Sequence, residues 1–109
     1  MVIMVRPHFA IVYDSQVHDQ LRVIDRKYHA LIRQTIETQL TYEPEVETRN
    51  RKPLLREMVF DADWELRFGP DNRFRVFYAV DSERREVQIL AVGIKSGNRL
   101  HIAGEVIDL

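Results

Sequence analysis

The strongest structural signal in the sequence lies in residues 64–80. Segments 64–68 and 73–80 alternate apolar and polar side chains, and Gly69-Pro70-Asp71-Asn72 separates them. Alternation with a period of two is typical of a strand with one buried face. Glycine, proline, aspartate and asparagine are the residues that tight turns favour. The stretch therefore predicts a β-hairpin, around which the rest of the chain is organised.

Alternation also sorts the side chains of this hairpin onto two faces. The apolar face contains Trp64, Leu66, Phe68, Phe74, Val76, Tyr78 and Val80. The opposite face contains Glu65, Arg67, Arg73, Arg75 and Phe77. Three arginines around one carboxylate make this second face the first candidate for function.

Arg67 and Arg75 lie on neighbouring predicted strands and point to the same side. Cross-strand partners are about 5 Å apart, and like charges at that distance repel unless an anion lies between them. Planar guanidinium groups match phosphate oxygens in bidentate fashion, so the pair could clamp a phosphate. The alternative is a solvated face on which Glu65 pairs with one arginine. The residues alone leave both interpretations open.

Composition restricts the classes of function. A chain of 109 residues suits one domain spanning 1–109, and a net charge of -1 means that any contact with nucleic acid must depend on local clusters. There is no cysteine, no histidine pair has metal-ligand spacing, and no phosphate-loop or nucleotide motif occurs, so we expect neither metal nor cofactor. No stretch resembles a membrane span or a signal peptide, which predicts a cytoplasmic protein.

Helical structure is predicted before the hairpin. Apolar residues recur at steps of three and four from Val17 to Leu40. The pattern permits one helix over residues 15–40, or two helices separated at 25–27. The region that follows, 43–61, has weak periodicity and predicts a loop.

Strands are predicted on both sides of these elements. The run 9–13 predicts a first strand and 86–94 a long one, while 99–102 predicts a last short strand or the start of a docked tail. Short turns between them favour a mostly antiparallel sheet with helices on one face, an α+β fold.

Further basic residues lie outside the hairpin. Arg49, Arg51, Lys52 and Arg56 form a cluster that could follow a nucleic-acid backbone or merely keep a loop soluble. Lys95, Arg99 and His101 follow the last long strand, whose pairing beside the hairpin would bring them to the arginine face. His101 is the best candidate for proton transfer, because imidazole titrates near neutral pH. Phe77 could stack on a base or pack beneath a tail.

Four segments together resemble the RelE/ParE toxin superfamily of bacterial toxin–antitoxin modules. They are Arg51-Lys52-Pro53-Leu54, Trp64-Glu65-Leu66-Arg67-Phe68-Gly69, Phe74-Arg75-Val76-Phe77-Tyr78-Ala79-Val80 and Ile89-Leu90-Ala91-Val92-Gly93. The hallmark of that family is a leucine–arginine, short turn, aromatic–arginine–x–x–tyrosine hairpin. A hydrophobic strand that ends in Val-Gly and a basic residue follows it.

The resemblance implies an N-terminal strand, a helical hairpin, and a three- to four-stranded, mostly antiparallel sheet, which favours the break at 25–27. It also implies a cytoplasmic toxin neutralised by a cognate antitoxin. In the RelE branch the toxin enters the ribosome and cleaves mRNA without metal, because the 2′-hydroxyl of the substrate attacks the adjacent phosphate. The protein then supplies positive charge and groups that move protons.

The resemblance also implies roles for individual residues. Arg75 matches the arginine that stabilises the transition state, Lys95 a basic residue after the last long strand, and His101 a functional tyrosine. The implied catalytic set is Arg75, Arg67, Glu65, His101 and Lys95. The implied RNA-binding set is Arg49, Arg51, Lys52, Arg73 and Arg99.

Two alternatives remain open within this resemblance. Asp63 and Glu65 stand where RelE proteins often have lysines. This favours a ParE-like inhibitor that acts by binding DNA gyrase, or a degenerate member that binds only its antitoxin. Glu65 could instead be a general base that acts with Arg75 and His101.

Overall fold

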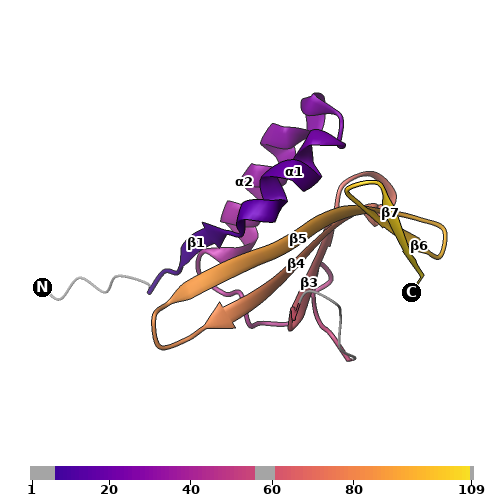
Figure 1. The fold of residues 1–109 in the computed structure, drawn as a ribbon. Coiled ribbons are helices and arrows are strands. Elements are labelled where there is room, and N and C mark those ends of the chain that lie inside the picture. Colours follow the sequence, from indigo (N-terminus) through magenta and orange to yellow (C-terminus); the bar gives the residue numbers. More distant parts are fainter. Residues whose placement is uncertain (1–6, 56–60, 109) are drawn as a thin grey trace, which may run out of the picture.

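The structure, a computed structural model, describes residues 7–55 and 61–108 and confirms the α+β class. In chain order the elements are β1 (Ala10–Tyr13), α1 (Ser15–Arg22), the 3₁₀ turn η1 (Arg26–Tyr28), α2 (His29–Leu40), β2 (Arg51–Pro53), β3 (Trp64–Phe68), the 3₁₀ turn η2 (Pro70–Asn72), β4 (Phe74–Asp81), β5 (Glu86–Ser96), β6 (Arg99–Ile102) and β7 (Glu105–Asp108). The two helices lie together on one side of a twisted sheet (Figure 1).

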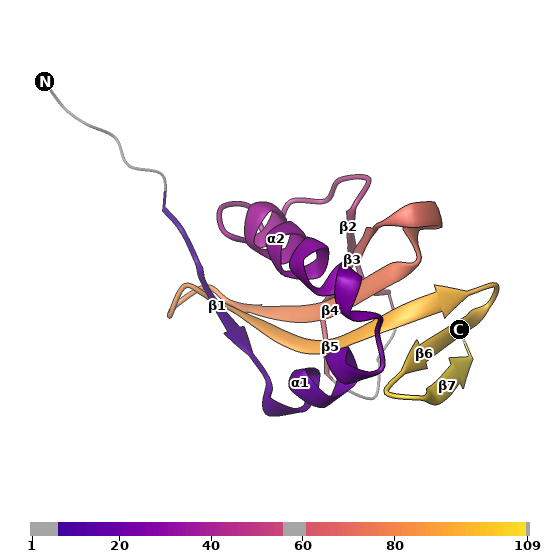
Figure 2. The ribbon, with the colours of Figure 1, turned by 90° about the horizontal axis from the view of Figure 1, so that it is seen from above.

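Strand β5 is the central strand of the sheet and pairs with β4, β6 and β1. The strands follow the order β2-β3-β4-β5-β6-β7, all antiparallel to their neighbours, and β1 pairs with β5 in parallel. Because β4 occupies one edge of β5, β1 and β6 share the other: β1 pairs with 86–89 and β6 with 94–96. Figure 2 shows β1 and the β6–β7 hairpin beside different parts of β5. Within the described residues the sheet has seven strands, more than the three or four predicted from the sequence.

The helical region is divided at the position that the family resemblance favours, and the single-helix interpretation is wrong. The Asp25 carboxylate accepts a hydrogen bond from the Lys27 backbone N–H at 3.0 Å, which begins a new turn in place of continuing α1. His29 Nε2 donates to the carbonyl oxygens of Leu21 and Ile24, at 2.8 and 2.9 Å. These contacts satisfy carbonyls at the end of α1 and hold α2 folded back beside it.

The predicted hairpin is present, and its apolar face meets the helices. Trp64 pairs with Tyr78 and Phe68 with Phe74, so the register places the predicted apolar side chains together. The buried core on this side contains Val17, Ile24, Ile32, Ile36, Leu40, Leu66, Phe68, Phe74, Val76, Tyr78, Val87, Ile89 and Val92. Trp64 and Val80 are partly buried against it.

The other face of the sheet has a smaller core of its own. Its buried members are Ala62, Phe77, Ala91, Leu100 and Ile102. Phe77 is fully buried there, so the option that it stacks on a base is wrong and the packing option is correct. Strands β6 and β7 supply Leu100, Ile102 and Ile107 to this cluster, which explains why the apolar tail of the chain forms a hairpin.

Part of the region predicted as a loop forms a strand, so the prediction of a loop over 43–61 is wrong for residues 51–53. Residues 51–53 form β2, which pairs with β3 at the edge of the sheet. The strand is too short to show periodicity, and Pro53 is tolerated because an edge strand has one side without a partner strand.

Candidate functional site

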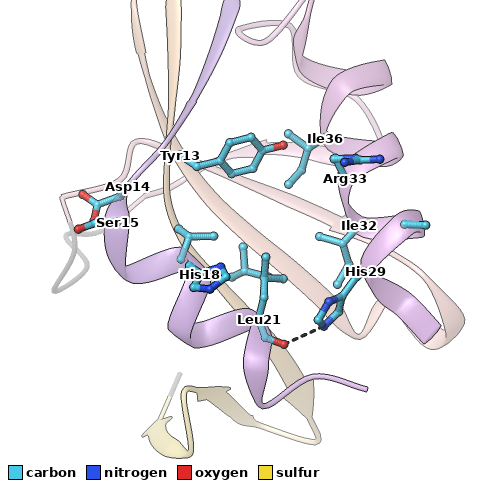
Figure 3. A pocket seen from close by; sticks show the side chains of 12 residues that line it. Tyr13, Asp14, Ser15, His18, Leu21, His29, Ile32, Arg33 and Ile36 are labelled. Carbon is cyan, nitrogen blue, oxygen red and sulfur yellow. Dashed lines mark hydrogen bonds between the residues drawn. The ribbon is translucent and has the colours of Figure 1, made fainter. Parts of the chain in front are cut away.

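A cavity of about 550 Å³ lies between the two helices. Its lining is mostly apolar and includes Val17, Leu21, Ile32, Ile36 and Val92, with Tyr13 at one side (Figure 3). Burial raises the pKa of Tyr13; Glu37 adds to the increase and Arg33 opposes it. His29 also lines the cavity, but its Nε2 is hydrogen-bonded to the backbone carbonyls of Leu21 in α1 and Ile24 just after it. Asp14, Ser15, His18 and Arg33 also line the cavity, but most of its wall is apolar, so it suits an apolar group better than a phosphate.

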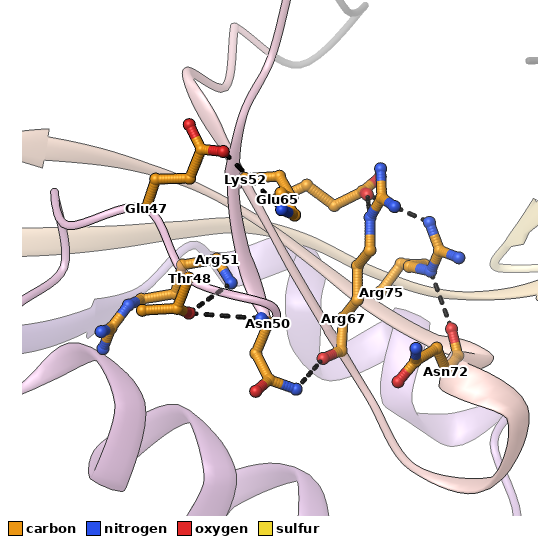
Figure 4. Close-up of polar contacts among 9 residues, drawn as sticks. All are labelled: Glu47, Thr48, Asn50, Arg51, Lys52, Glu65, Arg67, Asn72 and Arg75. Carbon is orange, nitrogen blue, oxygen red and sulfur yellow. Dashed lines mark hydrogen bonds and ion pairs between the residues drawn. The ribbon is translucent and has the colours of Figure 1, made fainter.

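The arginine face is the second candidate, and here a carboxylate stands between the two arginines. Arg67 and Arg75 are directly opposite in the register, which confirms that they share a face. Glu65 Oε1 accepts from Arg75 Nη1 at 3.0 Å and also from Arg67 Nε (Figure 4). The side chains of Glu65 and Arg75 are only 6% and 8% exposed, whereas that of Arg67 is 41% exposed. The expected open cationic clamp is thus closed by an internal anion.

Arg75 is oriented by two hydrogen bonds. Besides Glu65, its Nε donates to the Asn72 carbonyl oxygen at 2.9 Å. Burial lowers the pKa of Arg75, and the Glu65 carboxylate partly opposes that effect. An arginine has five N–H donors, so these two bonds fix the guanidinium plane without using all of them.

Next to Arg75 lies a polar cavity of about 360 Å³. Its lining is Asp71, Arg73, Arg75, Lys95, Ser96 and Gly97. Turn η2 and the end of β5 build it, and a hydrogen bond of 2.7 Å from the Lys95 N–H to the Arg73 carbonyl joins them. Two cationic residues, Arg75 and Lys95, and one carboxylate residue, Asp71, line this small cavity, which suits an anion such as a phosphate group.

Arg73 takes a position that strand alternation does not predict. Its backbone is helical (φ -79°, ψ -22°), because it closes η2 before β4 begins. Its guanidinium therefore turns toward the helical side, where Nη2 donates to the Tyr28 hydroxyl at 2.9 Å. Arg73 Nε is buried and has no hydrogen-bond partner in the described part of the chain. The assignment of Arg73 to the Glu65 face is wrong.

His101 lies on the opposite face of the sheet from the arginines. It pairs with Ile94, which packs against the helix-side core, and lines a cavity of about 140 Å³ that includes Gln20 and Ile24. Arg99 shares this face by alternation, whereas Lys95 pairs with Leu100 and reaches the arginine side. The expectation that the end of β5 brings all three groups to the arginine face is wrong for His101 and Arg99.

The basic cluster after α2 is only partly on the surface. Arg51 is buried: Nε donates to the Val46 carbonyl at 2.9 Å and Nη1 to the Gln39 carbonyl at 2.6 Å. The expectation of an exposed Arg51 is wrong, because β2 turns this side chain inward. Lys52 pairs with Glu47 at 3.7 Å (Figure 4). Arg49 is exposed. Arg56 lies outside the described residues.

The sequence analysis does not identify Asp71, Ser96 and Gly97 as lining residues of the polar cavity. In a turn, these residue types are explained by backbone conformation alone, so the sequence carries no separate signal for a site there.

Within residues 7–55 and 61–108, no three His, Asp or Glu side chains cluster as metal ligands. No helix of this described part is long and apolar enough to cross a membrane.

Comparison with known proteins supports the fold. No protein-family model and no curated protein matches the chain. Among solved structures, a chain of the toxin–antitoxin complex RelBE2 from Mycobacterium tuberculosis is similar, with a TM-score of 0.66 and 23% sequence identity. The match covers 83% of this chain and 94% of that one. An identity of 23% shows a shared fold and nothing beyond it, and the match confirms the predicted RelE-like fold.

Proposed function

We propose that this protein is a cytoplasmic toxin of a type II toxin–antitoxin pair, that it cleaves mRNA at the ribosome without metal, and that a cognate antitoxin neutralises it. The main support for this proposal is the polar cavity: its lining includes Arg75 and Lys95, whose positive charges suit a phosphate. The fold, shared with a chain of a toxin–antitoxin complex, supports the biological setting.

The reaction proposed at the cavity is an intramolecular transesterification at a phosphate group of the RNA. The 2′-hydroxyl oxygen attacks the adjacent phosphorus, the bond from phosphorus to the 5′-oxygen breaks, and a cyclic phosphate and a 5′-hydroxyl result. Arg75 and Lys95 would stabilise the extra negative charge on the phosphorane. Asp71 would accept the proton of the attacking hydroxyl, and Lys95 would donate one to the leaving oxygen. His101, on the other face, is not used.

The second candidate is a ParE-like protein that inhibits DNA gyrase by binding. The internal pairing of Glu65 with both arginines favours it, because a binding inhibitor needs no free transition-state group. A degenerate protein that binds only its antitoxin would have the same feature.

Variants at the cavity test the enzyme proposal. We expect Arg75→Ala and Lys95→Ala each to lower mRNA cleavage about 100-fold or more, because each removes one charge from the transition state. Purified protein is added to translating ribosomes and mRNA 5′ ends are mapped, with DNA supercoiling by gyrase assayed alongside. Arg84→Ala, in the exposed turn after β4, is the control. Codon-phased cleavage by wild type supports the proposal; lost supercoiling with intact mRNA contradicts it.

A further inference from the structure

The helix connection η1 is joined to the polar cavity by one side chain. Arg73 lines the cavity, and its guanidinium carbon lies 5.2 Å from the centroid of the Tyr28 ring, with the Tyr28 hydroxyl as its hydrogen-bond acceptor. Residues distant in sequence are therefore in contact at this end of the molecule, and Arg73 links η1 to the lining of the cavity.

That surface carries more basic groups than the cavity alone. Lys27 Nζ lies 5.1 Å from the centroid of the same Tyr28 ring, and both Arg26 and Lys27 are exposed. We call Arg26, Lys27, Arg73, Arg75 and Lys95 the basic track. Acidic groups beside it are Asp25, whose carboxylate caps η1, Asp71 in the cavity, and Glu65, which is paired with Arg75. In a chain of net charge -1, this is a local excess of positive charge.

We infer that the basic track binds the backbone of single-stranded RNA, with one phosphate in the cavity and the neighbouring phosphates along η1. This rests on the proposed function and assigns the substrate strand a path past the cavity. A track of separate cations matches a chain of regularly spaced phosphates better than it matches one small anion. The Tyr28 ring is partly buried and already contacted by Arg73, so the track would contact phosphates and not bases. Little sequence preference is expected along η1.

The test measures binding separately from cleavage. A labelled single strand of 2′-O-methyl RNA, which lacks the attacking hydroxyl, is titrated with protein at several salt concentrations by fluorescence anisotropy. Arg26→Glu/Lys27→Glu should weaken binding about tenfold or more at low salt. It should also reduce the slope of log affinity against log salt by about 1.4, since each phosphate contact on a single strand contributes about 0.7. The stabilisation of the protein by inorganic sulfate, which needs only the cavity, should not change.

The matched control is Arg84→Glu/Arg85→Glu, which makes the same charge change in the exposed turn between β4 and β5. It should retain the wild-type affinity and slope. Equal losses in both double variants, or no loss in Arg26→Glu/Lys27→Glu, would overturn the inference. A matched DNA strand that binds more tightly than the RNA would overturn the choice of RNA.

The inference and the proposed function fail separately. If wild type cleaves mRNA while Arg26→Glu/Lys27→Glu binds RNA normally, RNA binding by the basic track is refuted and the proposed nuclease activity is supported. If wild type binds RNA through η1 but mRNA stays intact, the track stands and the nuclease is refuted.

Discussion

Glu65 determines what the two facing arginines can do. Without it, Arg67 and Arg75 would place like charges directly across a strand pair, an arrangement that destabilises a sheet. One carboxylate oxygen bonded to both guanidinium groups removes that repulsion and fixes the plane of Arg75 beside the cavity. Glu65 is therefore better described as a positioning residue than as a free base.

Removing this carboxylate should be costly for stability. Glu65→Ala leaves the largely buried Arg75 without its counterion, and we expect the free energy of unfolding to fall by about 2 kcal/mol. Glu65→Gln keeps an acceptor without the charge and should lose about half as much. Urea unfolding at pH 7 measures both. Glu83→Ala, an exposed acidic residue in the turn after β4, should stay within about 0.5 kcal/mol of wild type. A Glu65→Ala variant as stable as Glu83→Ala would refute this role.

At the scale of elements, β2 and the segment before it are held by one buried cation. Arg51 bonds two backbone carbonyls, and its Nη2 lies 3.7 Å from a carboxylate oxygen of Glu43. A three-residue edge strand has little hydrogen bonding of its own. The Arg51 side chain thus contributes to the position of β2 next to β3.

Arg49 and Arg51 form a matched pair of variants, because both substitutions remove one positive charge from the same segment. Arg51→Ala should lower the free energy of unfolding by about 2 kcal/mol, since two carbonyls lose their donor. Arg49→Ala should change it by less than about 0.5 kcal/mol, because the side chain is exposed. Chemical denaturation at neutral pH compares them. Equal effects would mean that Arg51 acts only through its charge.

The hairpin faces, the order of elements and the antiparallel sheet follow from the sequence, because strong alternation and turn residues are local signals. The positions of Arg73 and His101 do not. Arg73 departs from alternation because the turn ends one residue later than the pattern indicates. The β4–β5 register shifts between Phe77 and Tyr78. The face of the sheet on which His101 lies depends on the residue at which β6 begins. A shift of one residue moves a side chain to the other face, and no local signal fixes it.

At the scale of the whole molecule, Tyr78 connects the sheet to the chain that leaves α2. Its side chain is fully buried in the helix-side core, and its hydroxyl donates to the Pro44 carbonyl at 2.6 Å. The aromatic–arginine–x–x–tyrosine pattern thus combines two tasks: Arg75 faces the cavity, and Tyr78 holds the layers together.

Alkaline pH tests that connection. Burial raises the pKa of Tyr78 above its usual value; Glu45 adds to the increase and Arg51 opposes it. Above about pH 10 the unfolded chain loses the phenolic proton while the native protein keeps it, so stability is intact below that pH and falls as pH rises. One such proton makes the fall in the free energy of unfolding steeper by about 1.4 kcal/mol per pH unit.

The variant Tyr78→Phe should lower the free energy of unfolding by about 1 kcal/mol at pH 7. In urea unfolding from pH 10 upward, its free energy of unfolding should fall less steeply than that of wild type. Part of the decline should remain, because the pKa of Tyr13 is also raised by burial. Tyr42→Phe, at an exposed tyrosine, should keep the wild-type slope, and a Tyr78→Phe slope equal to it would refute the assignment.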